Sequence, residues 1–272
     1  MIVDEVPLET RIRATEENLW TLWQRFGQGP ECALYDVGGA LWFDTPLKQL
    51  PYNGVLRFRP TEEAESLIDH IFDHYRQRNV PFMWVVHPSS SPADLSDLLE
   101  ARGMTRVDTL PGMTMNLADL PPRELAPIGF EVREVTTNED LMAAQQLIAW
   151  RWDIREESIQ VHLDMTYAFR VGQPGSRLRC WIACIDGKPV SKVLLNLDAG
   201  VAGIHGVATK PEARGKGIAR VLTLEALHAG KEAGFQLAML HSSQMARNLY
   251  EKIGFRQVSE FKVFVSGAPF SV

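Results

Sequence analysis

One stretch of the sequence limits the choice of fold more than any other, the glycine-containing segment 206–220, GVATKPEARGKGIAR. An apolar run before it is typical of a strand, and an amphipathic run after it is typical of a helix. Four basic residues against Glu212 make residues 210–220 a positive segment in a chain of formal net charge -6. Because a helix N-terminus leaves backbone amides without partners, this arrangement predicts a backbone site for an anion.

Two common phosphate-binding motifs do not fit the segment. A P-loop requires Gly-Lys followed by Ser or Thr, whereas Lys216 is followed by Gly217. A dinucleotide fingerprint starting at Gly215 requires a third glycine where Arg220 stands, and a parallel βαβ pattern that the sequence does not show. The anion site must therefore belong to another kind of strand, loop and helix.

Length and composition predict two soluble domains. The chain has 272 residues, of which 45% are hydrophobic and 23% charged, as in ordinary globular proteins of two domains. No run approaches the roughly 18 apolar residues of a membrane span, and a pI of about 5.7 argues against a broad nucleic-acid or membrane surface. We expect a cytoplasmic protein that binds neither nucleic acid nor membrane, while a homodimer stays open.

The cysteines indicate neither disulfides nor a metal. There are three, Cys32, Cys180 and Cys184, and a reducing compartment disfavours disulfide bonds. The last two lie on one face of a predicted strand, without further cysteine or histidine ligands close in sequence. We expect them to be buried apolar residues and predict no metal site.

A proline-rich segment divides the chain. Three prolines lie within residues 120–128, where they stop both helices and central strands. We place one domain at 1–122 and another at 127–272. The second predicts the order strand, helix, helix, three strands, helix, strand, helix, strand, which gives an α/β (α+β) fold with a mixed sheet flanked by helices.

The first domain repeats part of this order. The segment LLEARGM (98–104) aligns with LYEKIGF (249–255), which places Leu99 where the second domain has Tyr250. Two unrelated helix-glycine-strand joints would give the same match, so both interpretations stay open. The helix start at 61–66 has acidic residues and no glycine pair. We expect its own residues to cap it, so that it binds no external anion.

The segment 207–219 resembles the acyl-CoA pyrophosphate loop of the GNAT superfamily of N-acetyltransferases. The carrying pattern is Arg214-x-x-Gly217-x-Ala219, after a strand and before a helix, with LYEKIGF downstream. In element order the resemblance covers residues 128–265. It implies a GNAT-like, mostly antiparallel sheet in tandem with a degenerate GNAT-like N-terminal domain that lacks the coenzyme loop.

The resemblance also implies acetyl-CoA as co-substrate and assigns residues to it. Amides of the loop would bind the pyrophosphate, and the end of the strand 201–209 would pair with the pantetheine arm as a neighbouring strand does. Ser243 stands where the family frequently has an asparagine, and it can cap the next helix, although a contact with the coenzyme arm is in doubt. The assigned residues are Val207, Ala208, Thr209, Arg214, Gly215, Lys216, Gly217, Ile218, Ala219 and Ser243.

Acetyl transfer to an amine needs a proton donor and a proton acceptor. Tyr250 stands where the family commonly has a tyrosine near the thioester sulfur, and with an ordinary pKa of about 10 it stays protonated. We expect Tyr250 to be the general acid. For the base, His205 shares the parity of Val207 and Thr209 on its strand. His241 is the second choice, and a water chain without a single base stays open.

We therefore predict an N-acetyltransferase that moves an acetyl group from acetyl-CoA to a primary amine of a small molecule by direct attack. The helices over residues 147–169 would wall the acceptor site, but no acceptor follows from them. The alternative is a non-catalytic acyl-CoA-binding sensor or interaction module, since a fold does not guarantee chemistry.

Overall fold

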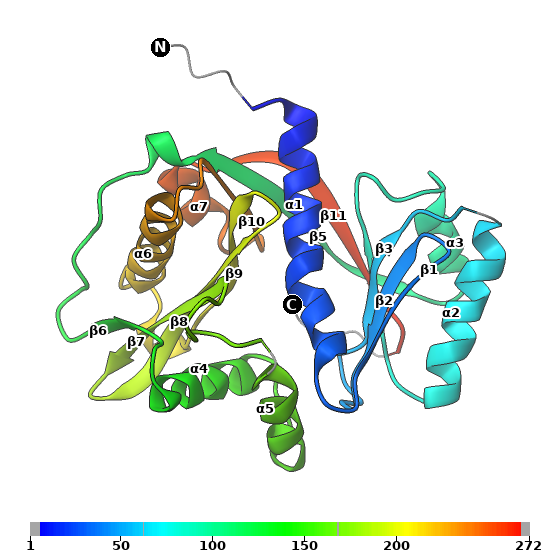
Figure 1. Ribbon diagram of the computed structural model, residues 1–272, viewed down its shortest axis with the longest axis horizontal. Coiled ribbons are helices and arrows are strands. Elements are labelled where there is room, and N and C mark those ends of the chain that lie inside the picture. Colours follow the sequence, from blue (N-terminus) through cyan, green and yellow to red (C-terminus); the bar gives the residue numbers. More distant parts are fainter. Residues whose placement is uncertain (1–5, 62, 168, 268–272) are drawn as a thin grey trace. The chain divides into compact units, whose positions relative to one another are not determined.

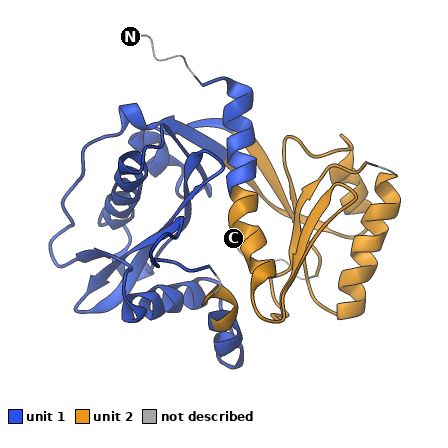
Figure 2. Cartoon of the chain, in the orientation of Figure 1, with its two compact units in different colours: residues 1–18, 112–163, 169–258 blue, residues 19–111, 164–168, 259–272 orange. Residues whose placement is uncertain are grey.

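A computed structural model describes residues 6–61, 63–167 and 169–267. The chain forms two compact units, each built from several stretches of sequence (Figure 2). Unit 1 contains residues 1–18, 112–163 and 169–258, and unit 2 contains residues 19–111, 164–168 and 259–272.

The elements alternate along the chain as Figure 1 labels them. The first part consists of α1 Leu8–Trp23, β1 Ala33–Val37, β2 Ala40–Asp44, β3 Gly54–Phe58, α2 Ala64–Arg78, β4 Met83–Val86, α3 Leu95–Ala101 and β5 Thr105–Asn116. The second part consists of β6 Glu131–Glu134, α4 Asn138–Arg151, α5 Ile159–Tyr167, β7 Leu178–Ile185, β8 Lys188–Asp198, β9 Val201–Thr209, α6 Ile218–Glu232, β10 Leu237–His241, α7 Arg247–Ile253 and β11 Arg256–Val265.

The sheet of unit 1 has the strand order β5-β10-β9-β8-β7-β6. Of its described strand pairs, β9 and β10 are parallel and the others are antiparallel. Two tight turns join β7, β8 and β9, and in both turns, Asp186-Gly187 and Ala199-Gly200, φ is positive at each residue. Paired positive φ angles give the backbone twist that two-residue hairpins need.

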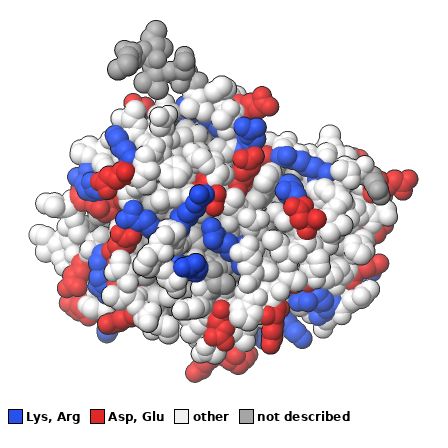
Figure 3. Space-filling view, viewed as in Figure 1, with Lys and Arg blue, Asp and Glu red and all other residues white. Residues whose placement is uncertain are grey.

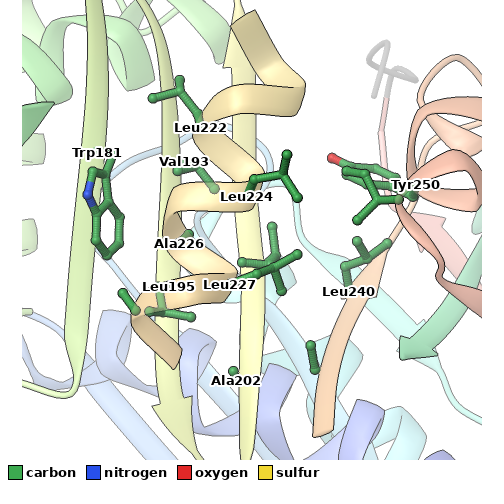
Figure 4. Close-up of a cluster of buried hydrophobic side chains, with 14 of the residues drawn as sticks. Trp181, Val193, Leu195, Ala202, Leu222, Leu224, Ala226, Leu227, Leu240 and Tyr250 are labelled. Carbon is green, nitrogen blue, oxygen red and sulfur yellow. The ribbon is translucent and has the colours of Figure 1, made fainter. Parts of the chain in front are cut away.

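Helices cover both faces of this sheet. On one face α6 packs against β7, β8 and β9, and Figure 4 shows Leu224 and Leu227 of this helix directed toward Tyr250 and Leu240. Gly230 allows a close approach there, because a Cβ at this position would lie 2.7 Å from the Cβ of Ala202. The opposite face carries α4, which packs against Cys180, Cys184 and other buried residues. Both of these cysteines are buried, as predicted.

Unit 2 has the strand order β1-β2-β3-β4-β11. Its main core is rich in aromatic residues, with α2 and α3 packed on β2, β3 and β4. Phe58 and Trp84 are both 0% exposed, and their ring centroids lie 5.0 Å apart. Aromatic side chains therefore form much of the core between these helices and the sheet.

Each unit takes its last strand from the other half of the chain. Residues 112–116 of β5 pair with β10 in unit 1, and residues 262–265 of β11 pair with β4 in unit 2. The set β8-β9-β10-β5 consequently has the same strand directions as the set β2-β3-β4-β11. This supports an internal repeat, and it means that the predicted domains 1–122 and 127–272 do not coincide with the compact units.

The predicted order of elements after residue 127 is confirmed. Thr137 caps α4, where its hydroxyl accepts a hydrogen bond of 3.1 Å from the Asp140 amide. Gly234 and Gly254 end α6 and α7 with positive φ angles, the conformation that favours glycine at a helix C-terminus. Over the described ranges, no helix is both long and apolar enough to cross a membrane. Basic and acidic side chains are intermingled over the face seen in Figure 3.

Candidate active site

Strands β9 and β10 part after three paired residues. Ala202, Gly203 and Ile204 pair with residues 238–240, and no pairing of residues 205–209 with β10 occurs within the described ranges. On its other edge β9 stays paired with β8 as far as Thr209. Residues 205–209 of β9 thus present an open strand edge, which can pair with an extended ligand.

A bulge in β9 lies at the start of this open edge. Lys192 pairs with Ala208 and Leu194 with His205, so three steps on β9 oppose two on β8. Gly206 lies in the bulge with φ +53, a left-handed conformation that favours glycine. The bulge turns the backbone of β9 at the point where the two strands part.

The loop between β9 and α6 presents backbone amides. Gly215 and Gly217 have φ angles of +73 and +82, and nothing described lies within 4 Å of a Cβ built on either. Within the described ranges, the amides of residues 215–219 donate no backbone hydrogen bond, whereas the amide of Arg214 donates to the Pro211 carbonyl at 3.2 Å. Five consecutive amides at a helix N-terminus fit a phosphate group, and Arg214 does not contribute its own.

Two arginines place positive charge beside the loop. Arg214 Nε donates to the Thr209 carbonyl at 3.0 Å, which fixes this side chain to the end of β9. Burial, and then the Arg214 charge, lower the pKa of Arg151 at the end of α4. An anion bound near both arginines would offset this repulsion. Sequence reasoning missed Arg151, because nothing in its spacing distinguishes it from the exposed arginines.

Tyr250 lies in the core between α7 and the sheet. Its side chain is 5% exposed, and Figure 4 shows its oxygen directed toward Leu224 of α6. Burial raises its pKa well above the ordinary value, so the hydroxyl stays protonated. Within the described part of the chain no group accepts a hydrogen bond from this hydroxyl. It can therefore donate to a ligand.

His205 is oriented by a residue of α1. Its Nε2 lies 2.8 Å from Asn18 Oδ1, and Asn18 Nδ2 donates to the carbonyls of Asn196 and Asp198 at 3.2 and 2.8 Å. Because the amide nitrogen is used as donor, the Asn18 oxygen accepts, so His205 Nε2 carries the proton and Nδ1 the lone pair. Sequence reasoning missed Asn18, which lies far away in the chain and in the predicted other domain.

Burial controls the charge of His205. It lowers the pKa to about 3, with a further contribution from the charge of Lys192. The ring is therefore neutral at pH 7 and only a weak base. His241 ends β10 at the point where the strands part, and it is partly buried.

Ser243 does not cap α7. That helix begins at Arg247, and Ala246 precedes it without a side-chain cap. The Ser243 carbonyl instead accepts the amides of Ala246 and Arg247, both at 3.1 Å. A turn over residues 244–246 therefore separates β10 from α7, and the expectation that Ser243 caps the helix is wrong.

The comparisons with known proteins agree with this geometry. Residues 144–255 match the Acetyltransferase (GNAT) family. The chain is 27% identical over 210 residues to the mycothiol acetyltransferase of Thermomonospora curvata, a match that covers 71% of this chain but only 66% of that protein, just under two thirds.

Solved structures share the fold along the whole chain. A GCN5-related N-acetyltransferase from Kribbella flavida superimposes with a TM-score of 0.70 at 18% identity, covering 94% of this chain and 96% of that one. A tandem GNAT protein from the clavulanic acid biosynthesis pathway gives 0.61 at 14% identity, covering 98% and 97%. The strand arrangement, the glycine loop and these matches agree: residues 144–255 match the Acetyltransferase (GNAT) family, and the chain has the fold of GCN5-related N-acetyltransferases.

Proposed function

We propose that this protein transfers an acetyl group from acetyl-CoA to a primary amine of a small molecule, and that the amine attacks the thioester directly. The observation that carries the proposal is the row of five amides at residues 215–219 next to the open edge of β9. The amides suit a pyrophosphate, and the edge suits an extended arm with amide groups. The open space at Gly215 and Gly217 leaves room for the phosphates.

Each proposed group has one task. Residues 215–219 and the pair Arg151 and Arg214 hold the pyrophosphate, and the backbone of 205–209 orients the arm. Tyr250 keeps its proton until a thiolate forms and then donates it. His205 stays the sequence's candidate for the base, with its lone pair on Nδ1.

The cysteines support direct attack. Burial raises the pKa of the Cys180 thiol to about 11 and raises that of Cys184 as well. A thiol that stays protonated is a poor nucleophile. We therefore assign no acyl-enzyme step to these two residues.

Two measurements test the proposal. Calorimetric titration with acetyl-CoA should give binding, and an assay of thiol release with glucosamine, L-cysteine, 2-phenylethylamine and spermidine should give turnover with at least one amine. Binding without turnover of any amine would instead support an acyl-CoA sensor. Absence of binding would exclude both functions.

A further inference from the structure

A lysine lies buried in the sheet next to the open edge of β9. Lys192 of β8 is 5% exposed. It pairs with Ala208 next to the bulge. Only one further pair, Ser191 with Thr209, follows before the β8-β9 ladder ends. Lysine is among the residues least often buried without a partner, so this position calls for a reason.

No described group compensates its charge. Within the described ranges, the Lys192 amine makes no hydrogen bond and no ion pair. The titratable groups that interact with it are Cys180 of β7, His162 of α5 and His205 of β9, and none of these is a carboxylate. Because burial of an ammonium without a counter-ion is costly, the surroundings favour the uncharged amine.

The amine lies at the bulge. A Cβ built on Gly206 would lie 2.9 Å from Lys192 Nζ, so the nitrogen covers the very residue where β9 turns. The open edge of β9 begins here. An acyl group held at this end of the edge would lie next to the residue that the nitrogen covers.

The fold itself does not require a lysine here. In unit 2 the bulge lies between Leu41 and Trp42, so Leu41 is the residue directly before it, as Lys192 is in unit 1. Leu41 is 3% exposed. The unit without the glycine loop thus has an apolar side chain where the unit with the loop has an amine.

Burial weakens the neighbouring histidines as bases. It is the main cause that lowers the pKa of His205 to about 3 and that of His162 to about 4. His162 Nε2 also lies 3.2 Å from Gln145 Oε1. Burial lowers the pKa of Lys192 as well. Alkyl amines are ordinarily stronger bases than imidazoles.

We propose that the uncharged amine of Lys192 takes the proton from the ammonium group of the acceptor, a step that rests on the acetyl transfer proposed above. The acceptor nitrogen then has a lone pair and forms a bond to the acyl carbon, while the bond from that carbon to sulfur breaks. The sulfur takes the proton of the Tyr250 hydroxyl. The nitrogen then loses its second proton, and this proton restores the hydroxyl. Lys192 finally releases its proton to water.

Two substitutions at one position separate this role from others. Lys192→Met keeps the length without a base, and Lys192→Arg keeps a permanent charge without a base at neutral pH. We expect both to lower kcat at least 100-fold with the amine that the wild type acetylates. The dissociation constant of acetyl-CoA should change less than twofold. Lys188→Met, on the exposed start of the same strand, is the control and should keep wild-type rates.

A spectroscopic titration gives a readout that needs no acceptor. The ¹⁵Nζ signal of Lys192, assigned by its absence in Lys192→Met, should titrate below 10.5, the ordinary value. A signal that stays protonated up to pH 10 would overturn the proposal. A Lys192→Arg variant with wild-type kcat would also overturn it, because that result indicates binding of an anion.

The two proposals fail in different ways. If the wild type binds acetyl-CoA but acetylates none of the four amines, acetyl transfer to small amines is wrong, and the role of Lys192 is wrong with it. If the wild type is active and Lys192→Met has the same kcat, only the role of Lys192 is wrong.

Discussion

The two units have the same four-strand arrangement but differ in what they place where two parallel strands part. In unit 1 the position holds Lys192, His205 and an open edge. In unit 2 the residue directly before the bulge is Leu41, which is buried, and the rings of Phe58 and Trp84 pack together in the core. The difference shows that the strand arrangement is stable without any of the polar groups.

The N-termini of the corresponding helices α6 and α2 differ as well. Before α6, unit 1 has glycines and basic residues, whereas unit 2 has Glu63 and Glu65 at the start of α2. Glu63 makes no side-chain cap, contrary to the expectation that this start is capped for itself, and Arg102 binds Glu65 at 3.0 Å. Acidic residues at a helix N-terminus repel an anion. Unit 2 therefore has the framework of a coenzyme site but not its chemistry.

The largest effect on stability is expected from a substitution in the aromatic core of unit 2. Phe58→Ala removes a fully buried ring from its contact with Trp84 and should lower the free energy of unfolding by about 3–5 kcal/mol. Chemical denaturation measures this. Acetyl-CoA binding by the folded fraction should stay unchanged. A loss below about 1 kcal/mol would mean that the two rings contribute little to the stability of unit 2.

The second largest effect is expected when an acidic residue, like those at the start of α2 in unit 2, is placed in the loop before α6. Gly217→Glu puts a negative side chain among the free amides, so the dissociation constant of acetyl-CoA should rise at least 100-fold, which corresponds to about 2.7 kcal/mol. The matched control is Gly234→Glu at the other end of α6. That glycine also has a positive φ and nothing within 4 Å of a built Cβ. Equal weakening by both variants would show that the loop is not the anion site.

His205→Val replaces the buried imidazole with an apolar side chain and should change the response to acid. The pKa of His205 is about 3 in the folded protein and ordinarily 6.5, so the unfolded chain binds the extra proton first as pH falls. Stability is complete above pH 6.5 and is lost toward pH 3, by about 2 kcal/mol at pH 5. The variant should lose less stability between pH 7 and pH 5. If the free energy of unfolding of both proteins falls equally between pH 7 and pH 5, His205 is not a buried neutral histidine.

The smallest effect is expected at the general acid. Tyr250→Phe keeps the ring packing and removes a hydroxyl without a described partner, so the unfolding free energy should stay within about 0.5 kcal/mol. A thiol of ordinary pKa about 8.5 leaves readily, so the loss in kcat should be modest, about tenfold. Kinetics at saturating acetyl-CoA measure it. Unchanged kcat would assign the tyrosine to packing, as Leu99 packs in unit 2.

Local patterns predicted the elements that carry the candidate site, as far as they are continuous in sequence. The strand, the glycine loop, the helix and Tyr250 lie where the sequence placed them, because turn and cap preferences act over a few residues. Asn18, Arg151 and Lys192 were missed. They reach the site from α1, α4 and β8, and only the pairing of distant strands and helices brings them there.

The exchange of β5 and β11 was also beyond local reasoning. Both strands were predicted as strands at the ends of their halves, and each would have paired within its own half. Hydrophobic alternation specifies which face of a strand is buried, but not which of two similar edges it joins. Repeated halves offer two nearly equivalent edges.

The strand exchange sets an order of events during synthesis. One edge of β4 has no partner until residues 262–265 are made, about 180 residues later. At roughly 5–20 residues per second, that edge waits for about 9–36 seconds on the ribosome. An unpaired edge is a template for other chains, so during that interval the β4 edge of one nascent chain is open to pairing with another.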